Sequence, residues 1–163
     1  MSRTLETRTS TSSISAATNS RFSMLSKAVL RVRTEKTMMN PQALVSIVDD
    51  DESVRESLPD LLKEFGLASE TFSCAEEFLA KDGVSRSKCL ILDIAMSGMS
   101  GPELQQELNR RDVKIPIIFI TGHCDELLRS RLIEQGAIAC LIKPFSDDAM
   151  VDALNSALQA KLG

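Results

Sequence analysis

Long apolar runs are missing from this sequence, whose uninterrupted apolar stretches are all short. A helix that crosses a bilayer needs about 20 apolar residues, so we expect no membrane span. The four cysteines, Cys74, Cys89, Cys124 and Cys140, include no Cys-x-x-Cys pair, and we interpret them as reduced thiols of a cytoplasmic protein. Trp and Tyr are absent, and the only histidine, His123, has no placed partner, so we interpret it as a surface residue.

Basic residues are scarce outside the N-terminal region. Residues 1–39 hold seven Lys or Arg against two Glu, a balance of +5 in a chain with a net charge of −4, so the remainder carries −9. Nucleic-acid affinity comes largely from Lys and Arg that release counterions from the phosphate backbone. Direct DNA binding by this chain is therefore not expected.

Apolar periodicity is missing from residues 1–39. Eleven of the first twenty residues are Ser or Thr, so this segment buries too little to offset the entropy of ordering it. We interpret it as a disordered, basic tail, or as sequence upstream of the true start, because Met38 and Met39 directly precede the ordered region. An organelle transit peptide ranks below these two interpretations. Residues 40–163 are assigned to one domain, since the chain is too short for two of ordinary size.

From Ala43 onward, short apolar runs alternate with amphipathic stretches, which is typical of βαβ units and a parallel sheet. Four expected strands are almost continuously apolar, as in strands covered on both faces: Leu44–Val48, Cys89–Ile94, Ile115–Ile120 and Ala139–Ile142. A fifth, Ala68–Phe72, is more polar and suits an edge. Five helices are expected, over about 54–65, 75–80, from 100 or 101, over 125–136 and from 147.

Polar residues follow the expected strands where the strands end. Asp49-Asp50-Asp51 follows the first apolar run, Asp93 lies near the end of the third strand, Thr121-Gly122 ends the fourth, and Lys143-Pro144 ends the fifth. Taken singly, each is ordinary: Asp commonly begins a helix, and a lysine before proline can lie on the surface. Ligands of open parallel sheets bind at this edge, and carboxylates, a hydroxyl and an ammonium together match the needs of phosphoryl chemistry.

The chemistry expected of this set follows from its charges. Clustered carboxylates repel one another, and a dication with oxygen ligands, such as Mg²⁺, relieves the repulsion. A carboxylate beside the ion can act as a nucleophile on phosphorus and form an acyl phosphate. Lys143 and the metal supply positive partners for phosphoryl oxygens, and the Thr121 hydroxyl can donate a further hydrogen bond.

Four segments together resemble the receiver domain of bacterial two-component response regulators: 46–51 (SIVDDD), 90–94 (LILDI), 120–123 (ITGH) and 141–145 (LIKPF). The separations of 43 residues from Asp50 to Asp93, 28 to Thr121 and 22 to Lys143 also suit that family. The resemblance covers roughly residues 41–163. Within this family, the sequence is most similar to the FixJ-like subgroup, whose receivers precede a helix-turn-helix output domain. Because this chain stops after the fifth expected helix, a stand-alone receiver is expected.

The resemblance implies a fold and a set of partners. The fold would be α/β, CheY-like (flavodoxin-like) and doubly wound, with a five-stranded parallel sheet in the order 2-1-3-4-5. Asp93 would accept a phosphoryl group from a phosphohistidine of a sensor histidine kinase or a histidine phosphotransfer protein, and so modulate binding to a downstream protein. The protein would be a monomer or weak dimer. It would assist its own phosphorylation and dephosphorylation and not act as an enzyme on a separate substrate.

The same resemblance assigns roles to individual residues. Asp50 and Asp93 would bind Mg²⁺ directly, Asp49 would bind it through water, and the Ala95 carbonyl would be a further ligand. Thr121 would bind the phosphoryl group and shift on activation, and Lys143 would pair with that group. The bond between Lys143 and Pro144 is expected to be cis.

Two positions depart from the family's pattern. Ser97-Gly98 stands where the family usually has proline, so we expect a looser loop after the acceptor. Cys140 stands where an aromatic residue normally moves with the threonine. The switch region of Thr121, Cys140 and Phe145 is therefore expected to couple weakly to phosphorylation, unless Phe145 or Leu141 has taken over the role of the ring.

Three alternatives are weaker. A phosphatase or phosphotransferase of the haloacid-dehalogenase type needs an Asp two positions after the nucleophile, where this chain has Ala95. A flavodoxin shares the topology, but Trp, Tyr and a Ser/Thr/Gly-rich phosphate loop after the first strand are missing. A pseudo-receiver that binds partners without phosphorylation conflicts with the intact set of Asp50, Asp93, Thr121 and Lys143.

Overall fold

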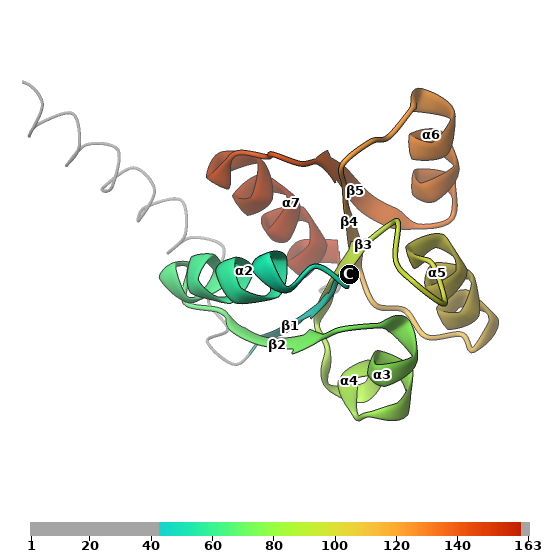
Figure 1. The fold of residues 1–163 in the computed structure, drawn as a ribbon, viewed down its shortest axis with the longest axis horizontal. Helices are drawn as coiled ribbons and strands as arrows, with labels where there is room; N and C mark the ends of the chain where they lie inside the picture. Colours follow the sequence, from blue (N-terminus) through green and yellow to red (C-terminus); the bar gives the residue numbers. More distant parts are fainter. Residues whose placement is uncertain (1–42, 161–163) are drawn as a thin grey trace, which may run out of the picture. The chain divides into compact units, whose positions relative to one another are not determined.

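A five-stranded parallel sheet forms the centre of the computed structural model, which describes residues 43–160 (Figure 1). The strand order is β2-β1-β3-β4-β5, as predicted. The strands are β1 (Leu44–Val48), β2 (Ala68–Phe72), β3 (Cys89–Asp93), β4 (Ile117–Thr121) and β5 (Ala137–Ile142). The tail predicted at residues 1–39 lies outside the described residues.

Helices cover both faces of the sheet (Figure 1). On one face lie α2 (Glu52–Glu64) and α7 (Asp147–Ala160), and on the other lie α3 (Ala75–Ala80), α4 (Gly83–Arg86), α5 (Gly101–Arg110) and α6 (Glu126–Glu134). None of the helices within residues 43–160 combines the length and apolar character that crossing a membrane requires.

The predicted strands and helices all form, with boundaries within a few residues of those expected. Within residues 43–160 the predicted count of five helices was one too low, because the segment after α3 forms the additional helix α4. This helix has a single turn, and four residues are too few to produce a helical repeat of apolar positions.

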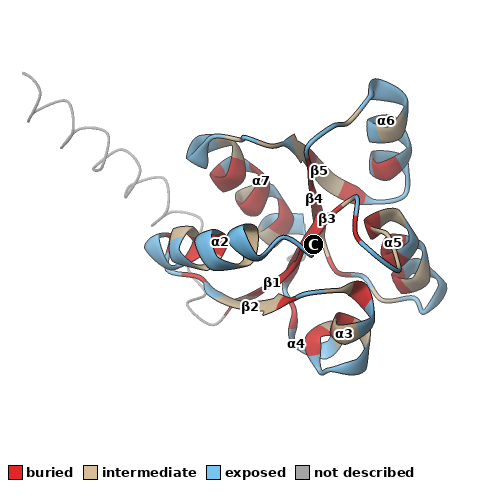
Figure 2. Cartoon of the chain, in the orientation of Figure 1, coloured by how far each residue is buried: buried red, intermediate tan, exposed pale blue. Residues whose placement is uncertain are grey.

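The central strands are buried on both faces, as their continuous apolar sequences predict (Figure 2). Every residue of β3 and β4 is buried. The predicted edge strand β2 is exposed or half-buried at four of its five positions, and only Phe72 is buried. Strand order reverses between β1 and β3, so the ends of these two strands border the crevice in which open parallel sheets bind ligands.

Gly101 lets α5 begin directly against the end of β3. A Cβ atom at this position would lie 2.2 Å from the carbonyl oxygen of Asp93 and 3.1 Å from the Cα of Ile94. The Gly101 amide donates to the Ile94 carbonyl at 3.1 Å, which holds the close approach. Any side chain at this position therefore has to push the helix and the strand apart.

We expect Gly101→Ala to lower the free energy of unfolding by about 1–3 kcal/mol, the usual cost of overpacking a filled site. Gly122→Ala is the matched control, because a Cβ at Gly122 meets nothing within 4 Å and the residue has no positive φ. Urea unfolding of both variants measures the difference. Equal stabilities would show that α5 can move away from β3 at little cost.

Candidate functional site

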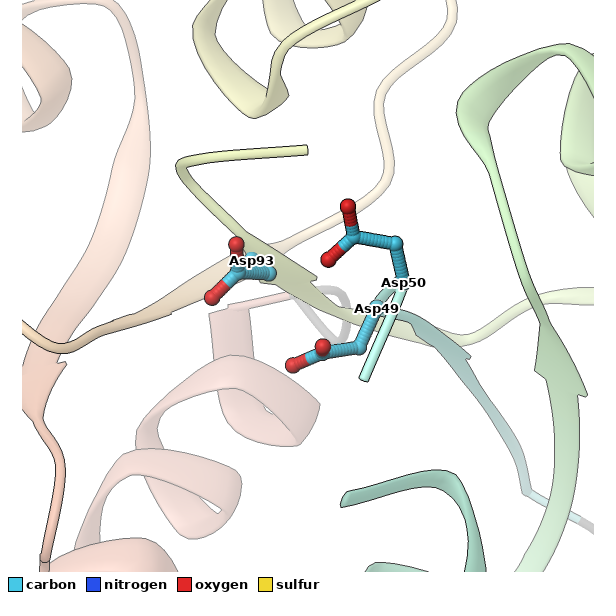
Figure 3. Close-up of side chains that lie close together, drawn as sticks. All are labelled: Asp49, Asp50 and Asp93. Carbon is cyan, nitrogen blue, oxygen red and sulfur yellow. The ribbon is translucent and has the colours of Figure 1, made fainter. Parts of the chain in front are cut away.

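Three carboxylates meet at the ends of β1 and β3 (Figure 3). Asp49 and Asp50 directly follow β1, and Asp93 is the last residue of β3. One oxygen from each lies within 4.8 Å of those of the other two. Asp49 and Asp93 are 1% and 6% exposed, whereas Asp50 is exposed. Two of the three negative charges are thus held in a buried position.

Lys143 bridges the two buried carboxylates. Its Nζ donates to Asp49 Oδ2 at 2.8 Å and to Asp93 Oδ1 at 2.9 Å, and its side chain is 26% exposed. The residue follows β5, where its amide donates to the Thr121 carbonyl at 2.7 Å and extends the pairing with β4. The bond to Pro144 is cis, as predicted. The sheet thereby brings residues from three strand ends together.

Burial and charge compete in setting the ionisation of the pair. Burial, together with the negative charge of Asp49, raises the pKa of Asp93, although the hydrogen bond from Lys143 and the amide of Ala95 act in the opposite direction. Burial opposes the charge on Lys143, but its hydrogen bonds to Asp49 and Asp93 outweigh that effect and raise its pKa above the ordinary value. Lys143 therefore stays protonated while Asp93 carries a charge that the fold disfavours.

We expect Asp93→Asn to stabilise the protein at neutral pH in the absence of a divalent cation. Because the pKa of Asp93 is raised on folding, its contribution to stability is fully present below its ordinary value of 3.8 and is lost as the pH rises through the folded-state pKa. An amide at residue 93 stays neutral throughout, so the variant should exceed the wild type at neutral pH and approach it in acid.

Urea unfolding between about pH 3 and 7 measures this effect, with Asp60→Asn on the exposed side of α2 as the control. If Asp93→Asn were less stable than the wild type at neutral pH, the ion pair with Lys143 would outweigh the burial of Asp93.

The donor set fits Mg²⁺. Within residues 43–160, the ammonium of Lys143 pairs with two of the three clustered carboxylates, and the guanidinium of Arg55 donates to the backbone carbonyl of Asp49 at 2.8 Å and not to a carboxylate. Excess negative charge therefore remains at the cluster, and carboxylate oxygens with access to water are the ligands that Mg²⁺ prefers.

The loop after β3 is tied to the site by hydrogen bonds that the sequence did not indicate. The amide and hydroxyl of Ser97 donate to Asp50 Oδ2 at 3.0 and 3.1 Å, and the Met99 amide donates to Glu76 Oε1 at 3.1 Å. A proline at position 97 could supply neither donor. That this loop is looser than in the family stays a prediction, but Ser97 gives it a contact with a candidate metal ligand.

Thr121 lies at the same edge, and its hydroxyl bonds to the following loop. The hydroxyl donates to the His123 carbonyl at 2.9 Å and accepts from the His123 amide at 3.3 Å. The residue is buried, and His123 is exposed, as predicted. Contact between Thr121 and a phosphoryl group on Asp93 stays a prediction.

Ala95 is exposed, and its amide donates to Asp93 Oδ2 at 2.8 Å. With Lys143 on Oδ1, both oxygens of Asp93 are hydrogen-bonded. The role of the Ala95 carbonyl as a metal ligand stays a prediction.

The other two switch residues occupy different surroundings. Cys140 is 3% exposed, and its thiol lies 3.3 Å from that of Cys124. Phe145 is half-buried and, with Pro144, lines an apolar groove beside α2. The weak coupling expected at Cys140 stays a prediction, and so does its alternative, in which Phe145 or Leu141 takes over the role of the ring.

The family model described as "Response regulator receiver domain" matches residues 45–155. Nodulation protein W of Bradyrhizobium diazoefficiens is 40% identical over 123 residues, which are 76% of this chain and 54% of that protein. The response regulator protein TodT of Pseudomonas putida is 38% identical over 122 residues, which are 75% of this chain and 54% of that protein. The chain thus spans about half the length of the curated relatives it matches.

The structural comparison agrees with the sequence match. The crystal structure of FixJ-N resembles this fold with a TM-score of 0.66 and 38% identity, over 72% of this chain and 94% of that one. This agreement bears out the resemblance to the FixJ-like subgroup. The sheet order, the family model and these relatives together show that this chain belongs to the receiver-domain family of two-component response regulators.

Proposed function

We propose that this chain accepts a phosphoryl group on Asp93 in a Mg²⁺-dependent reaction, with a phosphohistidine of a sensor kinase or phosphotransfer protein as the donor. Receiver domains of response regulators are phosphoacceptors, which supports the coarse function. The observation that carries the assignment to Asp93 is its position, buried at the end of β3, where it shares the ammonium of Lys143 with Asp49.

Asp93 is the best placed nucleophile of the three carboxylates. Its two oxygens are oriented by Lys143 and by the Ala95 amide, which fixes the carboxylate for attack. In the transfer, a bond forms between a carboxylate oxygen and phosphorus while the bond from phosphorus to the imidazole nitrogen breaks, and the imidazole leaves. Lys143 then pairs with a phosphoryl oxygen, since its ammonium already lies 2.9 Å from Asp93 Oδ1.

Asp49, Asp50 and Asp93 would hold Mg²⁺, with the Ala95 carbonyl as a further ligand. When bound, the ion neutralises charge on the carboxylates and on the phosphoryl oxygens. Without it, three carboxylates facing one ammonium would repel an incoming phosphate dianion.

The downstream step is proposed to be a change in protein binding and not DNA binding by this chain. Residues 40–163 carry a net charge of −9, which disfavours contact with a phosphate backbone. Because Cys140 is small, we propose that the chain acts mainly by accepting or passing phosphoryl groups. A pseudo-receiver stays the alternative, and it has no specific observation in its favour.

Incubation with phosphoramidate tests the phosphoacceptor role, because its P–N bond resembles that of phosphohistidine. We expect intact-mass analysis to show the addition of one phosphoryl group with Mg²⁺ and none with a chelator in excess. The control is the same donor after complete hydrolysis to phosphate. No mass increase with Mg²⁺ and either phosphoramidate or acetyl phosphate would favour the pseudo-receiver.

A further inference from the structure

Two of the four cysteines contact each other. The Sγ atoms of Cys124 and Cys140 lie 3.3 Å apart, and all four cysteines are free thiols in this structure. A disulfide has an S–S length of about 2.05 Å, so the two sulfurs need to approach by only a little more than 1 Å. Cys140 lies in β5, and Cys124 lies in the loop of residues 122–125 between β4 and α6.

The two thiols differ in accessibility in the way that a redox pair requires. Cys124 is half-buried in a loop without regular secondary structure, whereas Cys140 is 3% exposed in the core. An oxidant can therefore reach Cys124, and Cys140 is adjacent to resolve the product. We propose that Cys124 and Cys140 form an intramolecular disulfide when the protein encounters a peroxide.

The reaction needs only the two thiols and one equivalent of hydrogen peroxide. The Cys124 sulfur attacks a peroxide oxygen, the O–O bond breaks, and Cys124 becomes a sulfenic acid with release of one water. The Cys140 sulfur then attacks the Cys124 sulfur, the S–S bond forms, the S–O bond breaks, and a second water leaves. The two sulfurs lose two electrons and two protons in all, and the electrons reduce the peroxide.

The electrostatics of the pair favour this order of events. Burial and, to a smaller extent, the neighbouring Cys124 thiol together raise the pKa of Cys140 to about 12, while Arg129 acts in the opposite direction. Cys140 is thus a poor initial nucleophile. Oxidation of Cys124 removes the contribution of that thiol, so Cys140 becomes easier to deprotonate once its target has formed.

The crosslink would act on the loop that follows Thr121. The Thr121 hydroxyl bonds to the backbone of His123, the residue directly before Cys124. A bond from Cys124 to β5 would fix this loop and keep the hydroxyl turned toward His123. The oxidised protein should therefore accept the phosphoryl group several-fold more slowly than the reduced protein. This expected effect rests on the function proposed above.

Treatment of the full chain with hydrogen peroxide tests the proposal. We expect the intact mass to fall by two hydrogens, two of the four thiols to resist alkylation, and peptide mapping to join Cys124 to Cys140. Cys124→Ser and Cys140→Ala should each abolish the crosslink, and Cys140→Ser provides a second variant if the first folds poorly. Cys74→Ser should leave it intact, because Cys74 caps α3 and its thiol accepts from the Glu77 amide.

Two results would overturn the site: a product in which Cys124 stops at sulfinic acid with no crosslink, or a disulfide that maps to Cys74 or Cys89. Phosphoramidate labelling separates the site from its consequence. Equal labelling of the oxidised and reduced proteins would overturn the regulatory effect. Absence of labelling in both, with the disulfide formed, would count against the phosphoacceptor function and leave the redox pair standing.

Discussion

Asp93→Asn should abolish the addition of a phosphoryl group in the presence of Mg²⁺ and acetyl phosphate. An amide nitrogen and its carbonyl oxygen are poor nucleophiles compared with a carboxylate, so no acyl phosphate can form at residue 93. The amide is close in size to the carboxylate, and its carbonyl oxygen can still accept from Lys143 or Ala95, so the fold should persist. Intact-mass analysis over a time course measures the loss directly.

Asp51→Asn is the matched control for this experiment. Asp51 follows Asp50 in the chain, but its carboxylate accepts from the Ser53 amide at 2.9 Å and caps α2. Asparagine caps helices about as well as aspartate, so the control should label like the wild type. A phosphorylated peak of full size in Asp93→Asn would show that a residue other than Asp93 accepts the phosphoryl group.

Lys143→Met should slow phosphorylation by on the order of 100-fold, the usual effect of removing one preorganised donor to a developing negative charge. Methionine keeps much of the apolar stem and removes the ammonium that bonds Asp49 and Asp93. The initial rate of labelling should be compared at saturating Mg²⁺. The bound metal then offsets, at the carboxylates, the positive charge that the variant loses with the Lys143 ammonium.

Lys114→Met controls for the loss of one positive charge. Its side chain is 88% exposed, and its Nζ lies 3.8 Å from Asp112, at the end of the domain where β4 begins. We expect its labelling rate to equal that of the wild type. If the two substitutions slowed labelling equally, Lys143 would act only through the net charge of the protein.

The fold was largely predictable because its central strands are continuous apolar runs in the sequence. Runs such as Leu44–Val48 and residues 89–94 are apolar enough to require cover on both faces, and only a sheet with helices on both sides provides it. A glycine marks the end of the first of these helices: Gly66, which directly follows the helix expected over about 54–65, has a φ of +75°. The single turn of α4 was not predicted because four residues are too few to show a helical repeat of apolar positions.

The charged residues of the candidate site could be predicted from the sequence. The residues that hold them in place could not. Asp49, Asp93 and Lys143 stand out because charged groups beside buried strands are costly without partners. Ser97 and Gly101 gave no comparable signal. Ser and Gly are common in loops, and the bond from Ser97 to Asp50 joins residues 47 positions apart. The contact between Cys124 and Cys140 likewise depends on how a loop folds over β5, which periodicity does not encode.

Localisation of the phosphoryl group tests the central claim most directly. Borohydride reduces an aspartyl phosphate to homoserine, so the wild-type chain is labelled with phosphoramidate and Mg²⁺, reduced, digested and sequenced by mass spectrometry. We predict homoserine at residue 93 alone, and none when a chelator replaces Mg²⁺. Homoserine at Asp49 or Asp50, or labelling that is unaffected by the chelator, would contradict the account.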